Sequence, residues 1–264
     1  MRGRVLIVAG SDSGGGAGIQ ADIKTVTMLG AFGATAITAL TAQNTEGVYG
    51  VLPIAPAFIR QQMEVVLDDI GADAVKTGML HDAGVIETVA SVLDERGATI
   101  PLVLDPVMVA KGGAPLIQSE AIDALKTLLV PRAAVLTPNL PEAEILVGRP
   151  IADLAAMRAA ARTLLDLGCR AVLLKGGHLP GDTVHDLLAT AVGIREWQSP
   201  RIDSRHTHGT GCTLASAIAA GLAQGLAVED AVGRARDYVQ RAIASAPGLG
   251  RGHGPLDHAH PLRG

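Results

Sequence analysis

Aromatic residues are scarce in this chain of 264 residues, which contains one Trp, two Tyr and two Phe. So few rings give single-stranded nucleic acid no platform on which its bases could stack. Positive charge is not in excess either, because 22 Lys and Arg stand against 26 Asp and Glu, leaving a net charge of −4. Nucleic-acid backbones are bound by clustered basic residues. We therefore expect no nucleic-acid partner.

Cysteine is equally scarce, with Cys169 and Cys212 far apart in the sequence. Two distant cysteines make neither a disulfide framework nor the paired spacing of a structural zinc site. Residues 25–45 carry no charge, but Thr, Gly, Gln and Asn within them make a membrane span too polar. The basic N-terminus is followed by an apolar run too short for a signal peptide. We expect a cytoplasmic protein with no membrane partner.

Short apolar runs rich in β-branched residues are abundant in a chain that is 48% hydrophobic. They lie at residues 5–8, 35–40, 74–75, 102–104, 134–136 and 172–174. The intervals between them are long enough for a helix, which is the βαβ spacing of a parallel sheet. No linker or change of composition divides the chain. We expect one α/β domain over residues 1–264, with a mostly parallel central sheet.

The sequence predicts the boundaries of a helix between Asp153 and Gly168. Asp153 is a suitable N-cap, apolar residues at 154, 157, 161, 164 and 165 share one helical face, and Gly168 is expected at the C′ position.

Polar or glycine-rich residues follow each of the six expected strands. These segments are residues 9–18, 41–45, 76–79, 105–108, 137–142 and 175–178. The carboxyl ends of parallel strands meet at one edge of the sheet, where open α/β folds bind ligands. Six such turns at one edge predict a small-molecule site.

The strongest local signal is His-Gly-Thr-Gly-Cys-Thr at 208–213, which leads into an Ala- and Leu-rich helix ending near Gly225. Glycines at a helix start let main-chain N–H groups point outward, and the helix dipole favours negative charge there. This pattern indicates an anion hole for a transferring phosphoryl group. Tight packing of the helix against a neighbour is the alternative.

The glycine-rich loop 10–18 fits neither standard nucleotide-binding pattern. It lacks the Lys-Ser/Thr ending of a P-loop, and its glycines do not have the G-x-G-x-x-G spacing. The loop is instead consistent with close approach of the backbone to a ligand. Asp22, on the helix that follows, would then face that ligand, or would be a solvated residue near the helix start.

Several polar residues at the same edge have both an ordinary and a functional interpretation. Asp105 precedes Pro106, so its backbone is extended, and its carboxylate would suit Mg²⁺ or an ordinary turn. Asn139 and Glu142 have the spacing of a helix-capping pair. Lys175 could meet a polyphosphate or lie solvated.

Three histidines near the C-terminus, His253, His258 and His260, could suggest a metal site. Pro255 and Pro261 interrupt any helix there, so we expect a flexible terminus instead.

Taken together, these segments resemble the ribokinase-like superfamily, and within it the hydroxymethylpyrimidine/phosphomethylpyrimidine kinases of thiamine biosynthesis. The matching segments are AGSDSGGGAGIQADIKT (9–25), TAQNT (41–45), KTGM (76–79), DPVMVAKGG (105–113), TPNLPEAE (137–144), LLKGGH (173–178), THGTGCTLASA (207–217) and GHGPLDH (252–258). They cover essentially the whole chain, and several long motifs in this order are specific. No thiamine-phosphate synthase region is recognisable, so we expect a kinase alone.

The resemblance implies a three-layer α/β/α ribokinase-like fold, a homodimer, and ATP and Mg²⁺ as cofactors. It also implies two successive phosphorylations. The hydroxymethyl group of 4-amino-5-hydroxymethyl-2-methylpyrimidine is phosphorylated first, and the monophosphate then becomes the diphosphate.

The resemblance also assigns residues to the site. Gln43 would read the aminopyrimidine edge, since a carboxamide both donates and accepts hydrogen bonds. The same pocket would be lined by Gly10, Ala17, Asp22, Met79 and Val107. The anion hole would be formed by Gly209, Thr210, Gly211 and Cys212. Cofactor contacts would come from Lys175, Asn139, Thr207, Gly209 and Gly211. Asp105 and Glu142 would organise Mg²⁺ through water, and Lys175 would act on the ATP phosphates.

Cys212 stands where sugar kinases of the superfamily have an Asp that serves as the base. A helix N-terminus lowers the pKa of a thiol, so a thiolate base is feasible at Cys212. Phosphoryl transfer depends more on positioning than on base strength, and a thiol repels a phosphorylated substrate less than Asp does.

Two other functions stay open at this point. A pyridoxal kinase of the same superfamily is the nearer alternative, although Gln43 and its neighbours favour the pyrimidine. A non-catalytic pyrimidine-binding regulator is the other, and the retention of Lys175, Asp105, Glu142 and the glycine loop argues against it.

Overall fold

The computed structural model describes residues 2–108 and 119–263, and a nine-stranded sheet of order β3-β2-β1-β4-β5-β6-β7-β8-β9 runs through them. The strands are β1 (Arg4–Asp12), β2 (Phe32–Gln43), β3 (Val48–Pro53), β4 (Ala74–Thr77), β5 (Leu102–Leu104), β6 (Ala133–Leu136), β7 (Ala171–Lys175), β8 (Thr183–Thr190) and β9 (Gly193–Pro200). Six are mutually parallel, while β3, β8 and β9 are antiparallel and lie at the margins. The mostly parallel sheet is therefore confirmed. Residues 109–113 of the segment quoted as 105–113 lie outside the described residues.

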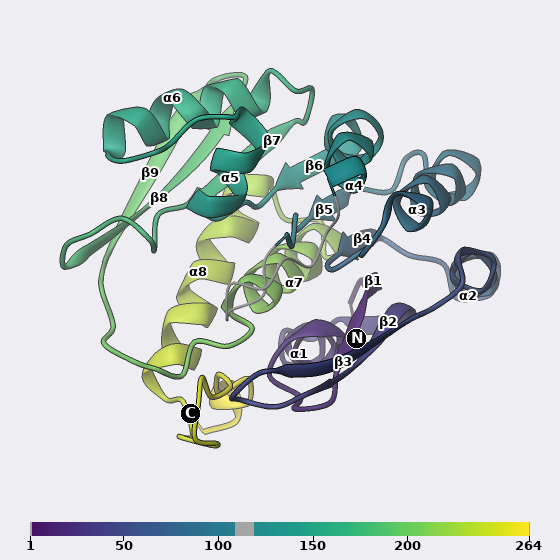
Figure 1. Cartoon of the computed structure of the whole chain (residues 1–264), viewed down its shortest axis with the longest axis horizontal. Coiled ribbons are helices and arrows are strands. Elements are labelled where there is room, and N and C mark those ends of the chain that lie inside the picture. The colour runs from purple at the N-terminus through teal and green to yellow at the C-terminus, as the bar shows by residue number, and fades with distance from the viewer. Residues whose placement is uncertain (1, 109–118, 264) are drawn as a thin grey trace.

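Helices cover both faces of this sheet, which gives the expected α/β/α layers (Figure 1). One layer contains α2 (Pro56–Asp69), α3 (Ala83–Arg96), α4 (Ser119–Ala124), α5 (Leu140–Val147) and α6 (Leu154–Leu165). The other contains α1 (Gly18–Met28), α7 (Thr210–Ala223) and α8 (Val228–Ala244). The short helical turns are Leu125–Leu129, Val130–Arg132 and His260–Arg263. Each layer has its own apolar core against the sheet, because both faces of the parallel strands are hydrophobic.

The expected helix boundaries hold with one adjustment. Asp153 caps α6, its side chain accepting a hydrogen bond of 2.7 Å from the N–H of Ala156. Gly168 has a positive φ of 104° but lies two residues after the C-cap Asp166, so its placement at C′ was wrong by one residue. Here the chain continues past the helix before it turns.

The C-terminal segment is packed on α7 and α8, so the expectation of a flexible terminus was wrong. His258 is buried, its Nε2 lies 3.0 Å from the Thr213 hydroxyl, and its carbonyl accepts a hydrogen bond from Tyr238. Burial lowers the pKa of His258 to about 4. These contacts replace the solvation that a free tail would have.

Two absences concern the described ranges 2–108 and 119–263. Within them, no helix has the length and apolar character needed to cross a membrane. The same ranges contain no group of three or more His, Cys, Asp or Glu arranged to hold a metal ion. The metal alternative for the C-terminal histidines therefore gains no support.

Candidate active site

The carboxyl edge of the parallel strands brings Asp105, Lys175 and Gly211 together. Asp105 follows β5 and Lys175 ends β7, and the Lys175 Nζ lies 3.4 Å from Asp105 Oδ1. A Cβ on Gly211, in the first turn of α7, would lie 3.3 Å from that Nζ and 3.6 Å from Asp105 Oδ2. The lysine and the carboxylate therefore meet directly at the start of α7, as the strand-end pattern predicted.

The loop before α7 is held in a fixed turn by Gly209 and Thr210. Gly209 is the N-cap of α7 and has φ +81°, and a Cβ there would collide with the Gly16 carbonyl oxygen. Only glycine fits this position. The Thr210 hydroxyl donates to the Thr207 carbonyl at 2.8 Å, which fixes the turn. The first N–H groups of a helix have no partners within it, and Gly211 in the first turn of α7 lies beside Lys175.

The thiol of Cys212 does not have the lowered pKa expected from its place in the sequence. Burial raises its pKa to about 12, with Asp22 and Asp105 adding to the rise, and these effects outweigh Lys76 and the N–H of Gly18. The helix dipole is worth only about 0.3–1 kcal/mol to a charge in the first turn, whereas full burial can shift a pKa by about 3–5 units. The thiol of the free protein is therefore neutral.

Asn139 and Glu142 form the capping pair that their spacing predicted. The Asn139 side chain accepts from the Glu142 N–H at 2.9 Å, and the Glu142 carboxylate accepts from the Asn139 N–H at 2.8 Å. The Glu142 side chain is only 4% exposed. Burial raises its pKa to about 7, with Asp105 adding to the rise and Lys175 opposing it. The capping pair thus holds a second buried carboxylate, that of Glu142, near Lys175 and Asp105.

Asp22 is fully buried and does not line the expected pyrimidine pocket. Both carboxylate oxygens lie 2.9 Å from the Lys76 Nζ, and Oδ1 also accepts from the Ser216 hydroxyl at 2.7 Å. Asp22 and Lys76 are both 0% exposed, so neither the pocket-lining role nor the solvated role fits Asp22. Burial lowers the pKa of Lys76, but Asp22, Cys212 and Asp105 together outweigh it and raise that pKa. Lys76 is therefore charged.

Lys76 lies in the segment KTGM, and the sequence did not reveal its ion pair with Asp22. The available signal was a lysine inside the apolar strand 74–77, where a buried cation requires a partner. The sequence could not show that the partner was Asp22, which lies on another element.

The remaining expected pocket residues lie at or after the ends of β1, β2, β4 and β5. A Cβ on Gly10 would lie 2.7 Å from Met79 Cε, so these two expected pocket residues are in contact. Gln43 ends β2, and its main-chain N–H donates to the Ser13 hydroxyl at 2.9 Å. Ala17 and Val107 are both partly exposed. The structure thus brings Gly10 and Met79 together and leaves Ala17, Gln43 and Val107 accessible.

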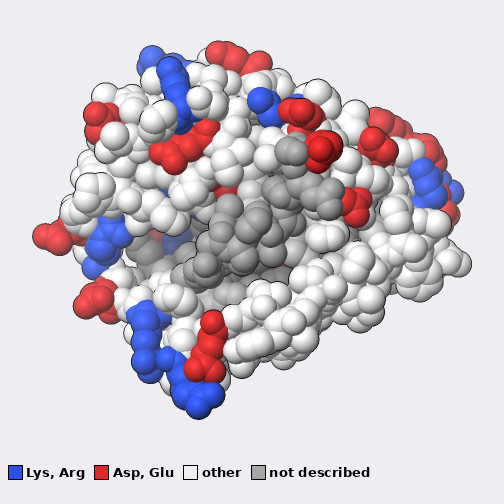
Figure 2. All heavy atoms as spheres, viewed as in Figure 1, with Lys and Arg blue, Asp and Glu red and all other residues white. Residues whose placement is uncertain are grey.

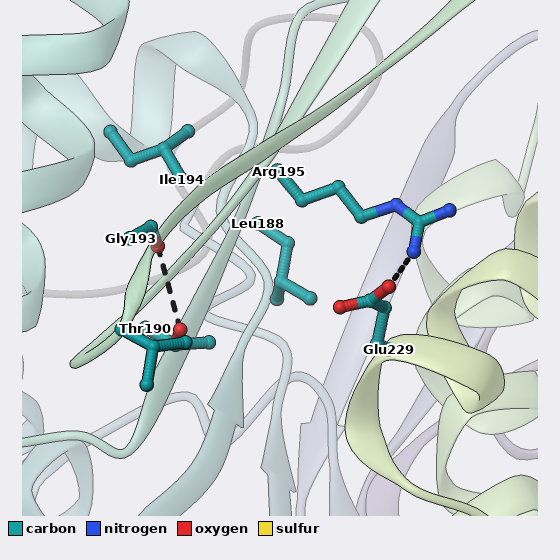
Figure 3. A pocket seen from close by; sticks show the side chains of 7 residues that line it. Leu188, Thr190, Gly193, Ile194, Arg195 and Glu229 are labelled. Carbon is teal, nitrogen blue, oxygen red and sulfur yellow. Dashed lines mark hydrogen bonds and ion pairs between the residues drawn. The ribbon is translucent and has the colours of Figure 1, made fainter.

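A separate pocket lies near the amino end of β7, away from the carboxyl ends of the parallel strands. It is lined by Leu188, Thr190, Val192, Gly193, Ile194, Arg195 and Glu229 (Figure 3). Thr190 pairs with Ala171 at the amino end of β7, opposite the end that carries Lys175. The two charged lining residues, Arg195 and Glu229, form an ion pair with each other. This pocket therefore takes no part in the candidate active site.

Sequence comparison identifies the relatives of the chain. The phosphomethylpyrimidine kinase family model matches residues 12–257. The chain is 56% identical over 97% of its length to thiamine biosynthesis bifunctional protein ThiED of Geobacter sulfurreducens, and it spans 52% of that protein. It is 48% identical over 97% of its length to hydroxymethylpyrimidine/phosphomethylpyrimidine kinase of Bacillus subtilis, covering 94% of it.

Solved structures agree with this assignment. An ADP complex of Bacillus subtilis pyridoxal kinase has a TM-score of 0.92 and 38% identity, covering 100% of this chain and 99% of that one. Phosphomethylpyrimidine kinase from Clostridium difficile 630 has a TM-score of 0.81 and 40% identity, covering 91% and 99%. The fold is thus that of ribokinase-like vitamin kinases, and the chain belongs to the phosphomethylpyrimidine kinase family.

Proposed function

We propose that this chain is an ATP-dependent phosphotransferase of thiamine biosynthesis that phosphorylates 4-amino-5-hydroxymethyl-2-methylpyrimidine to its monophosphate and then to the diphosphate. The observation that carries the proposal is the meeting of Lys175, Asp105 and the start of α7 at one edge of the sheet. Family membership supplies the substrate class. A structural neighbour, Bacillus subtilis pyridoxal kinase, was solved as an ADP complex, which supports a nucleotide as one ligand of this fold.

In the first step the hydroxymethyl oxygen forms a bond to the γ-phosphorus of ATP, the bond to the β–γ bridging oxygen breaks, and the hydroxyl proton is released. Lys175 and the N–H groups of Gly209, Gly211 and Cys212 would stabilise the charge on the transferring group. In the second step an oxygen of the monophosphate is the nucleophile. That oxygen is already ionised, so no strong base is required. The neutral Cys212 thiol suits a site that must admit both substrates.

The residues present fit the Mg²⁺ that we propose as second cofactor. Protein-bound Mg²⁺ typically takes one or two carboxylates, waters and substrate phosphates as ligands. The carboxylates of Asp105 and Glu142 both raise the pKa of the Lys175 ammonium, so both lie near it. When bound through water to these two residues, the ion would neutralise phosphate charge. Asn139 would keep Glu142 in place, and Thr207 would support the glycine loop beside the nucleotide.

Pyridoxal is the second candidate substrate, because a pyridoxal kinase is among the most similar structures. The relatives named as pyrimidine kinases reach higher sequence identity than this pyridoxal kinase, so the pyrimidine remains our proposal. A non-catalytic regulator is disfavoured, because Lys175, Asp105 and Glu142 are held in a cluster whose charges a binding module does not need.

Incubation with ATP, Mg²⁺ and the hydroxymethylpyrimidine should yield the monophosphate and then the diphosphate. ADP release and anion-exchange chromatography would follow both steps, with pyridoxal assayed in parallel. Monophosphate that accumulates without further conversion would contradict the two-step proposal. Turnover of pyridoxal alone would establish the second candidate, and no turnover of either would support the regulator.

Changing Gln43 to Leu should weaken binding of the pyrimidine by roughly ten-fold or more. The substitution removes one donor and one acceptor at similar volume, and each lost hydrogen bond costs about 0.5–1.5 kcal/mol. Gln43 lies at the end of β2, away from Lys175, so ATP binding should be unchanged. Calorimetric titration of both ligands would measure this. Equal weakening of both would show that Gln43 supports the fold instead.

We also propose a homodimer formed through β3, on the basis of its exposed apolar side chains. These are Val48, Tyr49, Val51 and Leu52, with Leu40 and Phe58 beside them. Tyr49 is 70% exposed on a strand at the margin of the sheet, where an unpaired edge favours association. Figure 2 shows this region, at lower right, without charged side chains, whereas acidic and basic groups are mixed elsewhere on that face.

Sedimentation velocity should show a dimer for the natural chain and a monomer for Leu52→Glu. Val192→Glu is the matched control, because Val192 is exposed at the opposite margin and should leave the dimer intact. A natural chain that sediments as a monomer would rule out the dimer.

We propose two further properties of the chain, its domain organisation and its compartment. We propose that residues 1–264 form one kinase domain, since the strands of both halves belong to the same sheet. We propose the cytoplasm as compartment, consistent with two cysteines that are free thiols.

A further inference from the structure

The side chain of Asp12 holds the first glycine-rich loop by hydrogen bonds. It ends β1 with a side chain only 1% exposed, and its carboxylate accepts from the N–H groups of Gly14 (2.7 Å), Gly16 (3.1 Å) and Ala17 (2.8 Å). One side chain therefore fixes the path of residues 12–18, which we call the substrate loop. A single carboxylate that holds three main-chain groups leaves this loop little freedom.

The same carboxylate reaches a second loop. His208 Nε2 lies 2.9 Å from Asp12 Oδ2, and His208 directly precedes Gly209 in residues 207–212, which we call the anion-hole loop. Burial raises the pKa of Asp12, but His208 and the N–H groups of Ala17 and Gly14 together lower it below its usual value. An ionised carboxylate only accepts hydrogen bonds, so His208 Nε2 carries the proton.

The backbones of the two loops are also in close contact. A Cβ on Gly16 would lie 2.6 Å from His208 Cδ2, and one on Gly209 would collide with the Gly16 carbonyl. Neither glycine can be replaced without moving one loop away from the other. The hydrogen bond between Asp12 and His208 thus joins surfaces that already fit each other.

The substrate loop reaches the pyrimidine side as well. The Ser13 hydroxyl accepts from the Gln43 N–H at 2.9 Å and donates to the Gln43 carbonyl at 2.8 Å. Gln43 and the anion-hole loop, which lie on different elements, are therefore both held by residues 12 and 13. No residue of the substrate loop needs to react for this to affect the rate.

We propose that Asp12 and His208 are positioning residues that hold the anion-hole loop at a fixed place relative to the pyrimidine pocket. The inference rests on the proposed function for its substrates. Reacting groups must lie within about 3–3.5 Å of one another, and a displacement of about 1 Å can cost two orders of magnitude in rate. A hydrogen bond that crosses between the two loops controls this distance more directly than one within either loop.

The test compares His208→Ala, His208→Gln and the control His253→Ala. His208 is part-exposed, with 19% of its side chain accessible, so its loss should leave the fold intact. His253 is an exposed histidine that contacts the Arg205 carbonyl outside both loops. At saturating substrates we expect kcat to fall about tenfold or more in His208→Ala. The amide N–H of His208→Gln can still donate to Asp12 and should restore most of the rate, while His253→Ala should match the natural chain.

Hydrogen exchange provides a readout that needs no substrate. The amides of residues 14–17 should exchange faster in His208→Ala than in the natural chain, and His208→Gln should restore their protection. An unchanged kcat with unchanged exchange would overturn the inference. So would a loss of Tm and rate that His208→Gln fails to rescue, since that marks a role in folding alone. Absence of turnover in the natural chain would instead reject the proposed function, and exchange would still decide whether His208 holds the loop.

Discussion

Replacing Lys76 by Met should lower the free energy of unfolding by about 3–5 kcal/mol. The substitution removes the cation that lies 2.9 Å from both oxygens of Asp22 and leaves that carboxylate buried with only neutral donors such as Ser216. A buried charge without its partner costs far more than an exposed one. Urea unfolding of the natural chain and the variant would measure the difference.

The loss should grow as the pH rises. Burial raises the pKa of Asp22 even in the natural chain, and without Lys76 the folded variant would favour the neutral acid still more. A carboxyl group whose pKa is raised by folding contributes stability at low pH, and this contribution disappears as the pH rises through the folded-state pKa. Unfolding at pH 5 should therefore show a smaller loss than unfolding at pH 8.

The double variant Lys76→Met with Asp22→Asn is the control for this explanation. It removes both charges, and Asn keeps an acceptor for the Ser216 hydroxyl, so most of the stability should return. If the double variant is as unstable as Lys76→Met, the cost arises from packing of the lysine stem and not from the unpaired charge.

Local patterns in the sequence were sufficient to predict the framework of the site. All six expected strands exist, because short β-branched runs separated by helix-length intervals admit few arrangements other than a parallel sheet. The capping pair Asn139 and Glu142 and the glycine N-cap of α7 depend only on neighbouring residues. Such features can be predicted because each is determined within one turn of the chain.

Features that depend on distant residues could not be predicted. Three strands were missed. β3 is exposed along its whole length at the margin of the sheet. β8 and β9 contain polar residues and lack the apolar runs of the central sheet. The pair of Lys76 and Asp22 joins residues 54 positions apart, and the bond between Asp12 and His208 joins residues 196 apart. The pKa of Cys212 was predicted in the wrong direction, because burial, the main cause of its rise, and the carboxylates of Asp22 and Asp105 that add to it depend on other elements.

Replacing Lys175 by Met should lower kcat by about 10²–10³ while ATP still binds, which is the typical cost of removing a donor that stabilises transition-state charge. The Lys175 ammonium lies 3.4 Å from Asp105 and beside Gly211. This is where we propose that the transferring phosphoryl group binds. Burial lowers its pKa, but Asp105 and Glu142 outweigh this and raise it, so the group is charged at neutral pH. Single-turnover rates at saturating ATP would give the loss for both steps, with thermal unfolding as the control for folding.

Cys212→Ala is the matched comparison for this prediction, because it keeps every main-chain N–H of the anion hole. The thiol has a pKa of about 12 and is neutral in the free protein, so its removal should cost less than removal of Lys175. A loss of about 10²–10⁴ confined to the alcohol step would instead identify the thiol as the general base, since only that step must release a proton from a neutral nucleophile. Equal losses of rate in Lys175→Met and Cys212→Ala on both steps would contradict the proposal that Lys175 stabilises the charge of the transferring phosphoryl group.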